Sequence, residues 1–297
     1  MSHAHHHHHG NKLGWAVFVN ILLSVAQVVG GILSGSLSLV ADALHNLSDA
    51  GALIIALVAQ KVARKPASLE LTYGYQRAEI IGALINSATL IVVGVYLLFE
   101  AISRFLNPEP IDGWIVVWLA ALALVIDVIT ALITYSAGAK TSLNIRAAFI
   151  HNVSDAAASV AVIVAGTLII LYQWYVVDLI ATVLISAYVI YHGVELSKSS
   201  IRILMQATPD NMNIQEVKKY LETQENVKTV SHIHVWQLNE HEYILEAQVV
   251  ITSLSDQSTL ARLKEGLQSR FGLSHTTLEL TEDSLVTHQC VEIDKYK

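Results

Sequence analysis

The sequence predicts an α-helical membrane domain of six spans, followed by a smaller α+β domain outside the bilayer. Of the 297 residues, 53% are hydrophobic and only 14% are charged, whereas about 25% charged residues is usual in a soluble protein. Apolar runs of the length that crosses a bilayer recur through the first two thirds of the chain. After residue 207 the composition changes, and eight Lys and Arg stand against 14 Asp and Glu.

The six apolar runs define the expected spans. The first run has no small-residue cleavage site after it, so it is interpreted as a span and not as a signal peptide. Lys and Arg gather in the loop after the second run, after the fourth run and after the sixth, while the opposite loops hold almost none. The positive-inside rule then predicts that both termini are cytoplasmic. The expected spans are residues 13–33, 39–60, 80–105, 114–138, 144–171 and 175–194.

The last third of the chain is typical of a small two-layer domain. A helix is expected at 214–223, two strands at 230–238 and 242–251 around a short hairpin loop, a helix at 258–271 and a strand at 276–280. The order α-β-β-α-β follows. The predicted domain organisation is a His-rich cytoplasmic arm (1–12), a membrane domain (13–207), a cytoplasmic α+β domain (208–284) and an irregular tail (285–297).

A six-residue pattern, His-Asn-x-Ser-Asp-Ala, occurs at 45–50 in the second span and again at 151–156 in the fifth. Ionisable groups are expensive inside a bilayer and mark functional sites. Residues four apart share a helix face, so His45 lies with Asp49 and His151 with Asp155. If the two helices pack together, two imidazoles and two carboxylates converge, a ligand set that suits tetrahedral Zn²⁺. We therefore expect zinc to be bound in the membrane and carried across it.

Such a site also predicts how metal movement is driven. Binding needs neutral His and ionised Asp, so metal and protons compete for the same side chains. Metal/proton antiport by alternating access is the expected mechanism, and the chain has no phosphate-binding loop for ATP. A membrane sensor that binds metal without translocating it remains an alternative, as does a channel. An intramembrane metalloprotease would need His-Glu-x-x-His, which is absent, so no enzyme is expected. The acidic last third argues against nucleic acid as a partner.

Two further acidic residues lie in the expected spans. Asp42 occurs one turn before His45 on the same face, where it can orient an imidazole, line the path of the ion or serve only the structure. Asp127 in the fourth span has no surrounding pattern and is interpreted as a packing or water-path residue.

Motifs in a fixed order along nearly the whole chain resemble the zinc-transporting branch of the cation diffusion facilitator family. That resemblance implies six helices, a cytoplasmic domain with a metallochaperone-like fold, a homodimer and zinc/proton exchange. The family's transport ligands carry over onto His45, Asp49, His151 and Asp155, and histidines at these positions imply zinc over manganese. Short loops are similar to those of bacterial exporters in the plasma membrane. The motifs are Gly-Ser-Leu-Ser-Leu at 35–39, Asp-Ala-Leu-His-Asn-Leu-Ser-Asp at 42–49, Thr-Tyr-Gly-Tyr-Gln-Arg-Ala-Glu at 72–79, Asn-Pro at 107–108, the second His-Asp pattern, and His-Ile-His-Val-Trp-Gln-Leu at 232–238.

A second metal site is conceivable in the cytoplasmic domain, where His232 and His234 are two apart on one expected strand and should face the same side. Family members often bind zinc in this domain, but Gln248 stands where many relatives have a histidine. A polar dimer surface is the alternative interpretation. The side chains that could supplement the pair are His275, Glu279, Glu282, His288 and Cys290.

Two other segments bear on metal binding. Some relatives carry an additional site in the loop between the second and third spans, but here Lys61–Glu79 contains no His or Cys, so that site is predicted to be absent. The histidines at position 3 and at 5–9 can collect divalent metal weakly. They are either a native zinc-gathering arm or a cloning tag, and transport should not require them.

Overall fold

The computed structural model describes residues 7–63, 65–136, 143–239, 242–253 and 258–282. The chain divides into two compact units. One consists of Met1–Leu57 with Gly82–Ser197 and holds most of the long helices. The other consists of Val58–Ile81 with Lys198–Lys297 and holds a small sheet. The predicted fold class, a helical membrane domain followed by an α+β domain, is confirmed.

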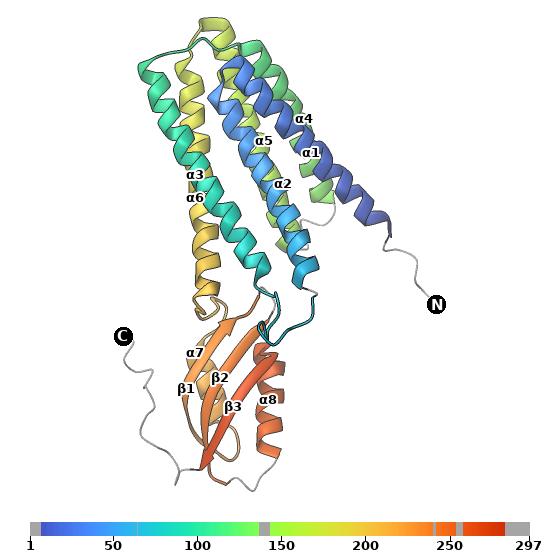
Figure 1. Cartoon of the computed structure of the whole chain (residues 1–297), viewed down its shortest axis with the longest axis vertical. Helices are drawn as coiled ribbons and strands as arrows, with labels where there is room; N and C mark the ends of the chain where they lie inside the picture. Colours follow the sequence, from blue (N-terminus) through green and yellow to red (C-terminus); the bar gives the residue numbers. More distant parts are fainter. Residues whose placement is uncertain (1–6, 64, 137–142, 240–241, 254–257, 283–297) are drawn as a thin grey trace. The chain divides into compact units, whose positions relative to one another are not determined.

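Long helices form the membrane domain (Figure 1). Each follows an apolar run, because a helix satisfies its own backbone hydrogen bonds and so can stand in lipid. The helices α2 to α6 contain stretches long and apolar enough to cross a bilayer, and α1 has a shorter apolar segment, Asn20–Ser34, among the described residues. The helices are α1 (His7–Ser34), α2 (Leu37–Ala63), α3 (Ala78–Leu106), α4 (Gly113–Ser136), α5 (Leu143–Tyr172) and α6 (Val176–Leu204).

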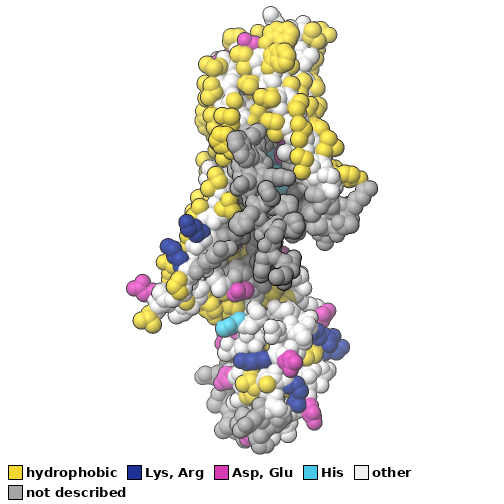
Figure 2. All heavy atoms as spheres, turned by 90° about the vertical axis from the view of Figure 1, so that its right-hand side faces the viewer, with side chains coloured by type: hydrophobic (Ala, Val, Ile, Leu, Met, Phe, Trp, Pro, Cys, Tyr) yellow, Lys and Arg dark blue, Asp and Glu magenta, His cyan; other side chains and the backbone are white. Residues whose placement is uncertain are grey.

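The face of this helical unit that Figure 2 shows is covered mostly by hydrophobic side chains where its residues are described. Large side chains such as Ile32, Phe99 and Trp118 are about 70% exposed, at 70%, 69% and 71%. Such exposure would be costly in water, but it is what helices facing lipid require. The surface chemistry of the unit therefore agrees with helices that lie in a bilayer, of which α2 to α6 are long and apolar enough to span it.

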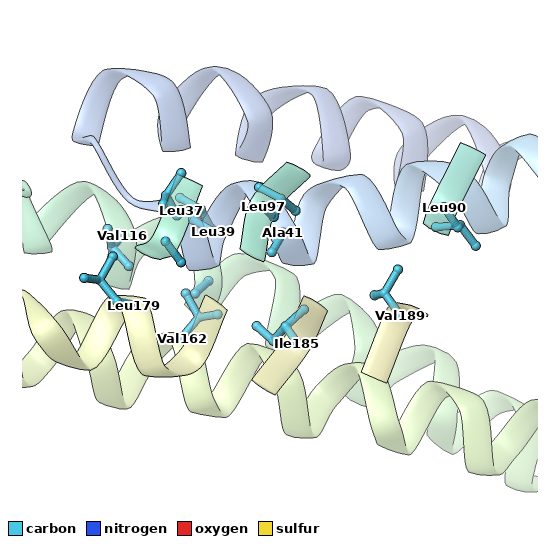
Figure 3. Packing of buried hydrophobic residues seen from close by; sticks show 12 residues of the cluster. Leu37, Leu39, Ala41, Leu90, Leu97, Val116, Val162, Leu179, Ile185 and Val189 are labelled. Carbon is cyan, nitrogen blue, oxygen red and sulfur yellow. The ribbon is translucent and has the colours of Figure 1, made fainter. Parts of the chain in front are cut away.

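The interior of the helical unit packs small and branched side chains closely (Figure 3). Leu39, Val116 and Val162, from three different helices, are completely buried within one cluster. The helices α4 and α5 lie close together at Gly113 and Gly166, where a Cβ atom on Gly113 would lie 2.7 Å from the carbonyl oxygen of Gly166. Small residues at such crossings let membrane helices make extensive van der Waals contact.

The turn between α1 and α2 is held by polar groups from other helices. Gly35 adopts φ +76°, a left-handed conformation that a side chain would strain. Its carbonyl oxygen accepts a 2.6 Å hydrogen bond from the guanidinium of Arg104 in α3. The buried carboxylate of Asp178, in the first turn of α6, accepts hydrogen bonds from the hydroxyls of Ser36 and Ser38 and from backbone N–H groups at the start of α2. The start of α2 is thereby tied to both α3 and α6.

Two helix boundaries differ from those expected. The helix α1 begins at His7, inside the segment interpreted as an arm, and α6 continues to Leu204, ten residues past the predicted end of its span. In both places the sequence turns polar while the backbone stays helical. Hydropathy measures only the apolar part of a helix, whereas helical hydrogen bonding continues into polar surroundings.

The C-terminal domain has the predicted order of elements: α7 (Ile214–Glu222), β1 (Val227–Gln237), β2 (Tyr243–Ile251), α8 (Ser258–Phe271) and β3 (His275–Glu282). β1 pairs antiparallel with β2, and β2 pairs parallel with β3, across the helix α8. Leu245, Ala247 and Val249 alternate along β2 toward the core that α7 and α8 complete with Val217, Leu221, Leu263 and Leu267. The predicted hairpin residues 240–241 and the predicted tail lie outside the described residues.

Candidate metal centre

The structure brings α2 and α5 together at the repeated His-Asp pattern. Along each helix the histidine and the aspartate are four residues apart and share a face, as expected. The Nε2 atom of His45 lies 3.7 Å from Asp49 of its own helix and 3.5 Å from Asp155 of the other. The Nε2 atom of His151 lies 3.2 Å from Asp49 and 3.6 Å from Asp155. Each carboxylate therefore contacts both imidazoles.

These contacts have the spacing of ligands around one ion. A tetrahedral metal bound at about 2.0–2.2 Å by nitrogen and oxygen separates neighbouring ligand atoms by about 3.3–3.6 Å. Among the described residues, His45, Asp49 and Asp155 form a group whose ligand atoms all lie within 4.8 Å of one another. The imidazole of His151 is not part of this group of three; it contacts Asp49 and the other carboxylate oxygen of Asp155, and its ring centroid lies 6.0 Å from that of His45.

Burial of the four side chains is uneven. The side chains of His45 and Asp155 are 7% and 10% exposed, whereas those of Asp49 and His151 are 33% and 43% exposed. One side of the group is therefore enclosed by protein, and the other opens at His151.

Other helices surround the group. Tyr188 of α6 lies edge-on to the ring of His45, with ring centroids 5.8 Å apart, and contacts His192 one turn further along. Ser48 donates a 3.1 Å hydrogen bond to Asn86 of α3, which links α2 to that helix beside Asp49. Tyr188 carries no motif in the sequence, so only the packing of α6 against α2 reveals it.

The two additional membrane carboxylates each have a polar partner. Asp42 accepts a 2.9 Å hydrogen bond from the amide nitrogen of Gln27 in α1. Asp127 accepts a 3.0 Å hydrogen bond from the hydroxyl of Ser159 in α5. Sequence analysis did not single out Gln27 or Ser159, although the spacing of Ser159, four residues after Asp155, was a signal that could have found it.

The side chains of His232 and His234 lie close together, with no third possible metal ligand beside them among the described residues. Their ring centroids lie 4.6 Å apart, although β1 does not alternate regularly there: a register shift falls between Ser231 and His234, and His232 adopts φ +51°. Neither His232 nor His234 belongs to a group of three or more possible ligands among the described residues. The bulge, not simple two-residue alternation, accounts for how the two rings meet.

The other side chains considered for that site are spread over β3 or lie beyond it. Glu279 accepts a 2.8 Å hydrogen bond from Gln248, and the ring of His275 lies against Tyr73, with centroids 6.0 Å apart. Glu282 ends β3. His288 and Cys290 fall outside the described residues. A cytoplasmic zinc site therefore stays a prediction.

The fold and the buried histidine–carboxylate group are typical of a membrane protein that handles divalent cations. The profile of the cation efflux transmembrane domain matches residues 15–205, and that of the cation efflux protein cytoplasmic domain matches residues 209–281. Together they cover most of the chain, which therefore belongs to the cation efflux family.

Characterised relatives span nearly the full length. The chain is 32% identical to a cadmium, cobalt and zinc/H⁺-K⁺ antiporter of Bacillus subtilis, over 96% of this chain and 93% of the relative. It is 30% identical to the zinc transporter ZitB of Escherichia coli, over 94% of this chain and 92% of the relative. It is 34% identical to the metal cation efflux system protein CzcD of Cupriavidus metallidurans, over 93% of this chain and 89% of the relative. These relatives are transporters, and none is named as an enzyme.

Proposed function

We propose that this chain exports zinc, exchanging Zn²⁺ for protons by alternating access through His45, Asp49, His151 and Asp155. The observation that carries the proposal is the spacing of these groups: four contacts of 3.2 to 3.7 Å join two imidazoles to two carboxylates inside a lipid-facing bundle. The match to the separation expected around a tetrahedral ion supports zinc, and the names of the relatives support efflux of zinc and similar cations.

Charge explains why the site would exchange metal for protons. Two ionised carboxylates offset a divalent cation inside the bundle, and without that cation their charge is costly unless protons replace it. Free imidazole titrates at about pH 6.5 in water. Histidine side chains can therefore take up protons when the metal leaves. A proton gradient directed inward would then drive the metal outward.

Several further features belong to the same proposal. Lys and Arg in the loop after α2 and near the end of α6 support cytoplasmic termini. The match of residues 209–281 to a cation efflux cytoplasmic domain fits this orientation and supports a homodimer built around that domain. Bacterial relatives support residence in the plasma membrane of a bacterium.

The test is zinc uptake into proteoliposomes that contain the purified full chain and have an acidic lumen. We expect uptake to consume the luminal acidity, and Asp49→Asn to lower the zinc affinity by at least ~10-fold, the scale seen when a metal's supporting ligands are changed. Ser154→Ala is the matched control, because this hydroxyl, next to Asp155, donates to the carbonyl of Ile150 in its own helix and has no other hydrogen bond among the described residues.

Three results would contradict the proposal in different ways. Undiminished uptake by Asp49→Asn would mean that zinc crosses by another route. Zinc binding by the wild type without any uptake would instead favour a membrane sensor. Zinc uptake that leaves the luminal pH unchanged at saturating zinc would refute the exchange for protons, while the proposal of zinc transport would still stand.

A further inference from the structure

A second group of buried polar side chains lies one helical turn from the four His and Asp residues. In α2, Asp42 precedes His45 by three residues, and in α5, Ser159 follows Asp155 by four. Each step is about one turn, roughly 5 Å along a helix. Asp127 of α4 and Gln27 of α1 join these two residues. We call Gln27, Asp42, Asp127 and Ser159 the second polar tier.

The tier is enclosed by protein. Gln27 and Ser159 are 0% exposed, Asp42 is 1% exposed and Asp127 is 8% exposed. Its two hydrogen bonds hold it as two pairs, one between α1 and α2 and one between α4 and α5. The Nε2 atom of His45 in α2 lies 3.5 Å from Asp155 in α5, and Asp42 and Ser159 each lie about one turn from that contact along their own helices. The two pairs are therefore held beside the same contact between α2 and α5.

Oxygen atoms of the tier lack partners. The Oε1 atom of Gln27 and the Oδ1 atom of Asp42 are buried and accept no hydrogen bond within the part of the chain that the structure describes. No Lys or Arg among the described residues forms an ion pair with Asp42 or Asp127. Unsatisfied acceptors and uncompensated carboxylates are both costly in a bundle surrounded by lipid. A cation would satisfy both.

We propose that the second polar tier is a divalent-cation site lined only by oxygen, which the transported ion occupies next to the His–Asp group. This inference rests on the proposed transport function. Two carboxylates match the charge of a divalent ion, and an amide oxygen and a hydroxyl add neutral ligands. Oxygen-only sets suit hard cations and bind zinc less tightly than sets with imidazole. The transported ion can therefore bind at the second polar tier weakly enough to leave again, as movement through successive sites requires.

The packing around the tier explains why an ion would wait there. Leu39 and Ala41 flank Asp42 on its N-terminal side, and Val162 lies one turn beyond Ser159; all three belong to the buried apolar cluster (Figure 3). With Val116 and Ala120 of α4, which are both 0% exposed, they close the bundle on the side away from His151. An ion that enters at His151 and passes the His–Asp group thus meets the tier before this apolar barrier.

The test uses Mn²⁺, a hard cation whose unbound signal in electron paramagnetic resonance reports binding, with the full chain in detergent. Four proteins are compared: the wild type, Asp127→Asn, the double variant His45→Gln/His151→Gln, and Thr130→Val. We expect Asp127→Asn to weaken Mn²⁺ binding at least ~10-fold and the double histidine variant to retain it. Thr130→Val is the matched control, because within the described part of the chain the Thr130 hydroxyl donates only to backbone carbonyls of its own helix α4.

Asp127→Asn should still fold, because the side-chain oxygen of Asn can accept the hydrogen bond that Ser159 donates to Asp127. A second variant, Gln27→Leu, keeps both carboxylates and removes only the amide oxygen, and it should weaken Mn²⁺ binding by a smaller factor. Loss of Mn²⁺ from the double histidine variant, with full binding by both Asp127→Asn and Gln27→Leu, would overturn the proposal. Zinc uptake measured on the same proteins separates the two hypotheses. Absent uptake with Mn²⁺ binding that follows Asp127 would refute transport alone.

Discussion

Replacing Asp178 by Asn should destabilise the helical unit far more than its small change in volume suggests. The carboxylate is 0% exposed. One oxygen accepts hydrogen bonds of 2.6 and 2.5 Å from the hydroxyls of Ser36 and Ser38, and the other accepts from the backbone N–H groups of Leu37 and Ser38 at 2.9 and 3.4 Å. The start of α2 is thus capped by a side chain from α6, which is 140 residues away along the chain.

The magnitude follows from what Asn cannot do. Its amide nitrogen cannot accept, so one pair of buried donors loses its acceptor, which costs about 1–3 kcal/mol. Loss of the negative charge at the N-terminus of a helix adds up to about 2 kcal/mol in a buried setting. We therefore expect Asp178→Asn to cost about 1–5 kcal/mol.

Asp112 supplies the matched control. It is an exposed carboxylate that caps α4 by accepting from the backbone of Trp114 and Ile115 at 3.0 and 3.4 Å. Asn caps an exposed helix start about as well as Asp, so Asp112→Asn should cost less than about 1 kcal/mol. Thermal unfolding in detergent and equilibrium unfolding in mixed micelles would compare the two variants. Equal losses of stability would refute the reasoning from burial and acceptor count.

Three further predictions concern packing and backbone conformation, each measured by unfolding of the full chain. Gly166→Ala should cost about 1–3 kcal/mol, because the new Cβ would lie 2.8 Å from Val117, whereas Gly51→Ala, whose nearest contact is at 3.8 Å, should cost nothing; equal effects would contradict close packing of α4 on α5. Leu263→Ala, in the core of the C-terminal domain, should cost about 2–5 kcal/mol of stability. A loss below about 1 kcal/mol, the scale expected for a substitution at an exposed site, would argue against that core. Asn226 adopts φ +71° and its side chain bonds to Ser253 and Thr259; Asn226→Ala should therefore be more destabilising than Asn226→Gly, which keeps the backbone conformation, and the opposite order would refute this account.

Much of the helical unit could be predicted from hydropathy because each span satisfies its backbone hydrogen bonds within itself. Whether a segment crosses the bilayer then depends almost only on its own composition. The same locality explains why His45 and Asp49 could be assigned to one face of α2 without any knowledge of its neighbours. Positions where the sequence turns polar while the helix continues, as in α6 after residue 194, were not predictable from that signal.

The second polar tier, in contrast, could not be predicted from local sequence. Gln27, Asp127 and Ser159 come from three different helices, and nothing near each residue in the sequence points to the others. In lipid, the choice of helix partners depends on small residues and polar contacts distributed along whole helices. Hydrogen bonds such as that from Ser159 to Asp127 become visible only when α4 and α5 are packed together.

By itself the sequence determined the number and placing of the apolar helices, the order of elements in the C-terminal domain and the pairing of each histidine with the aspartate four residues away, since all of these depend on local periodicity. The tertiary structure alone decided that α2 and α5 bring the two patterns within 3.2 to 3.7 Å. It alone also decided that Asp178 caps a distant helix, and that a strand bulge sets the two histidines of β1 against each other. These features depend on contacts between segments far apart in the chain, which local patterns do not encode.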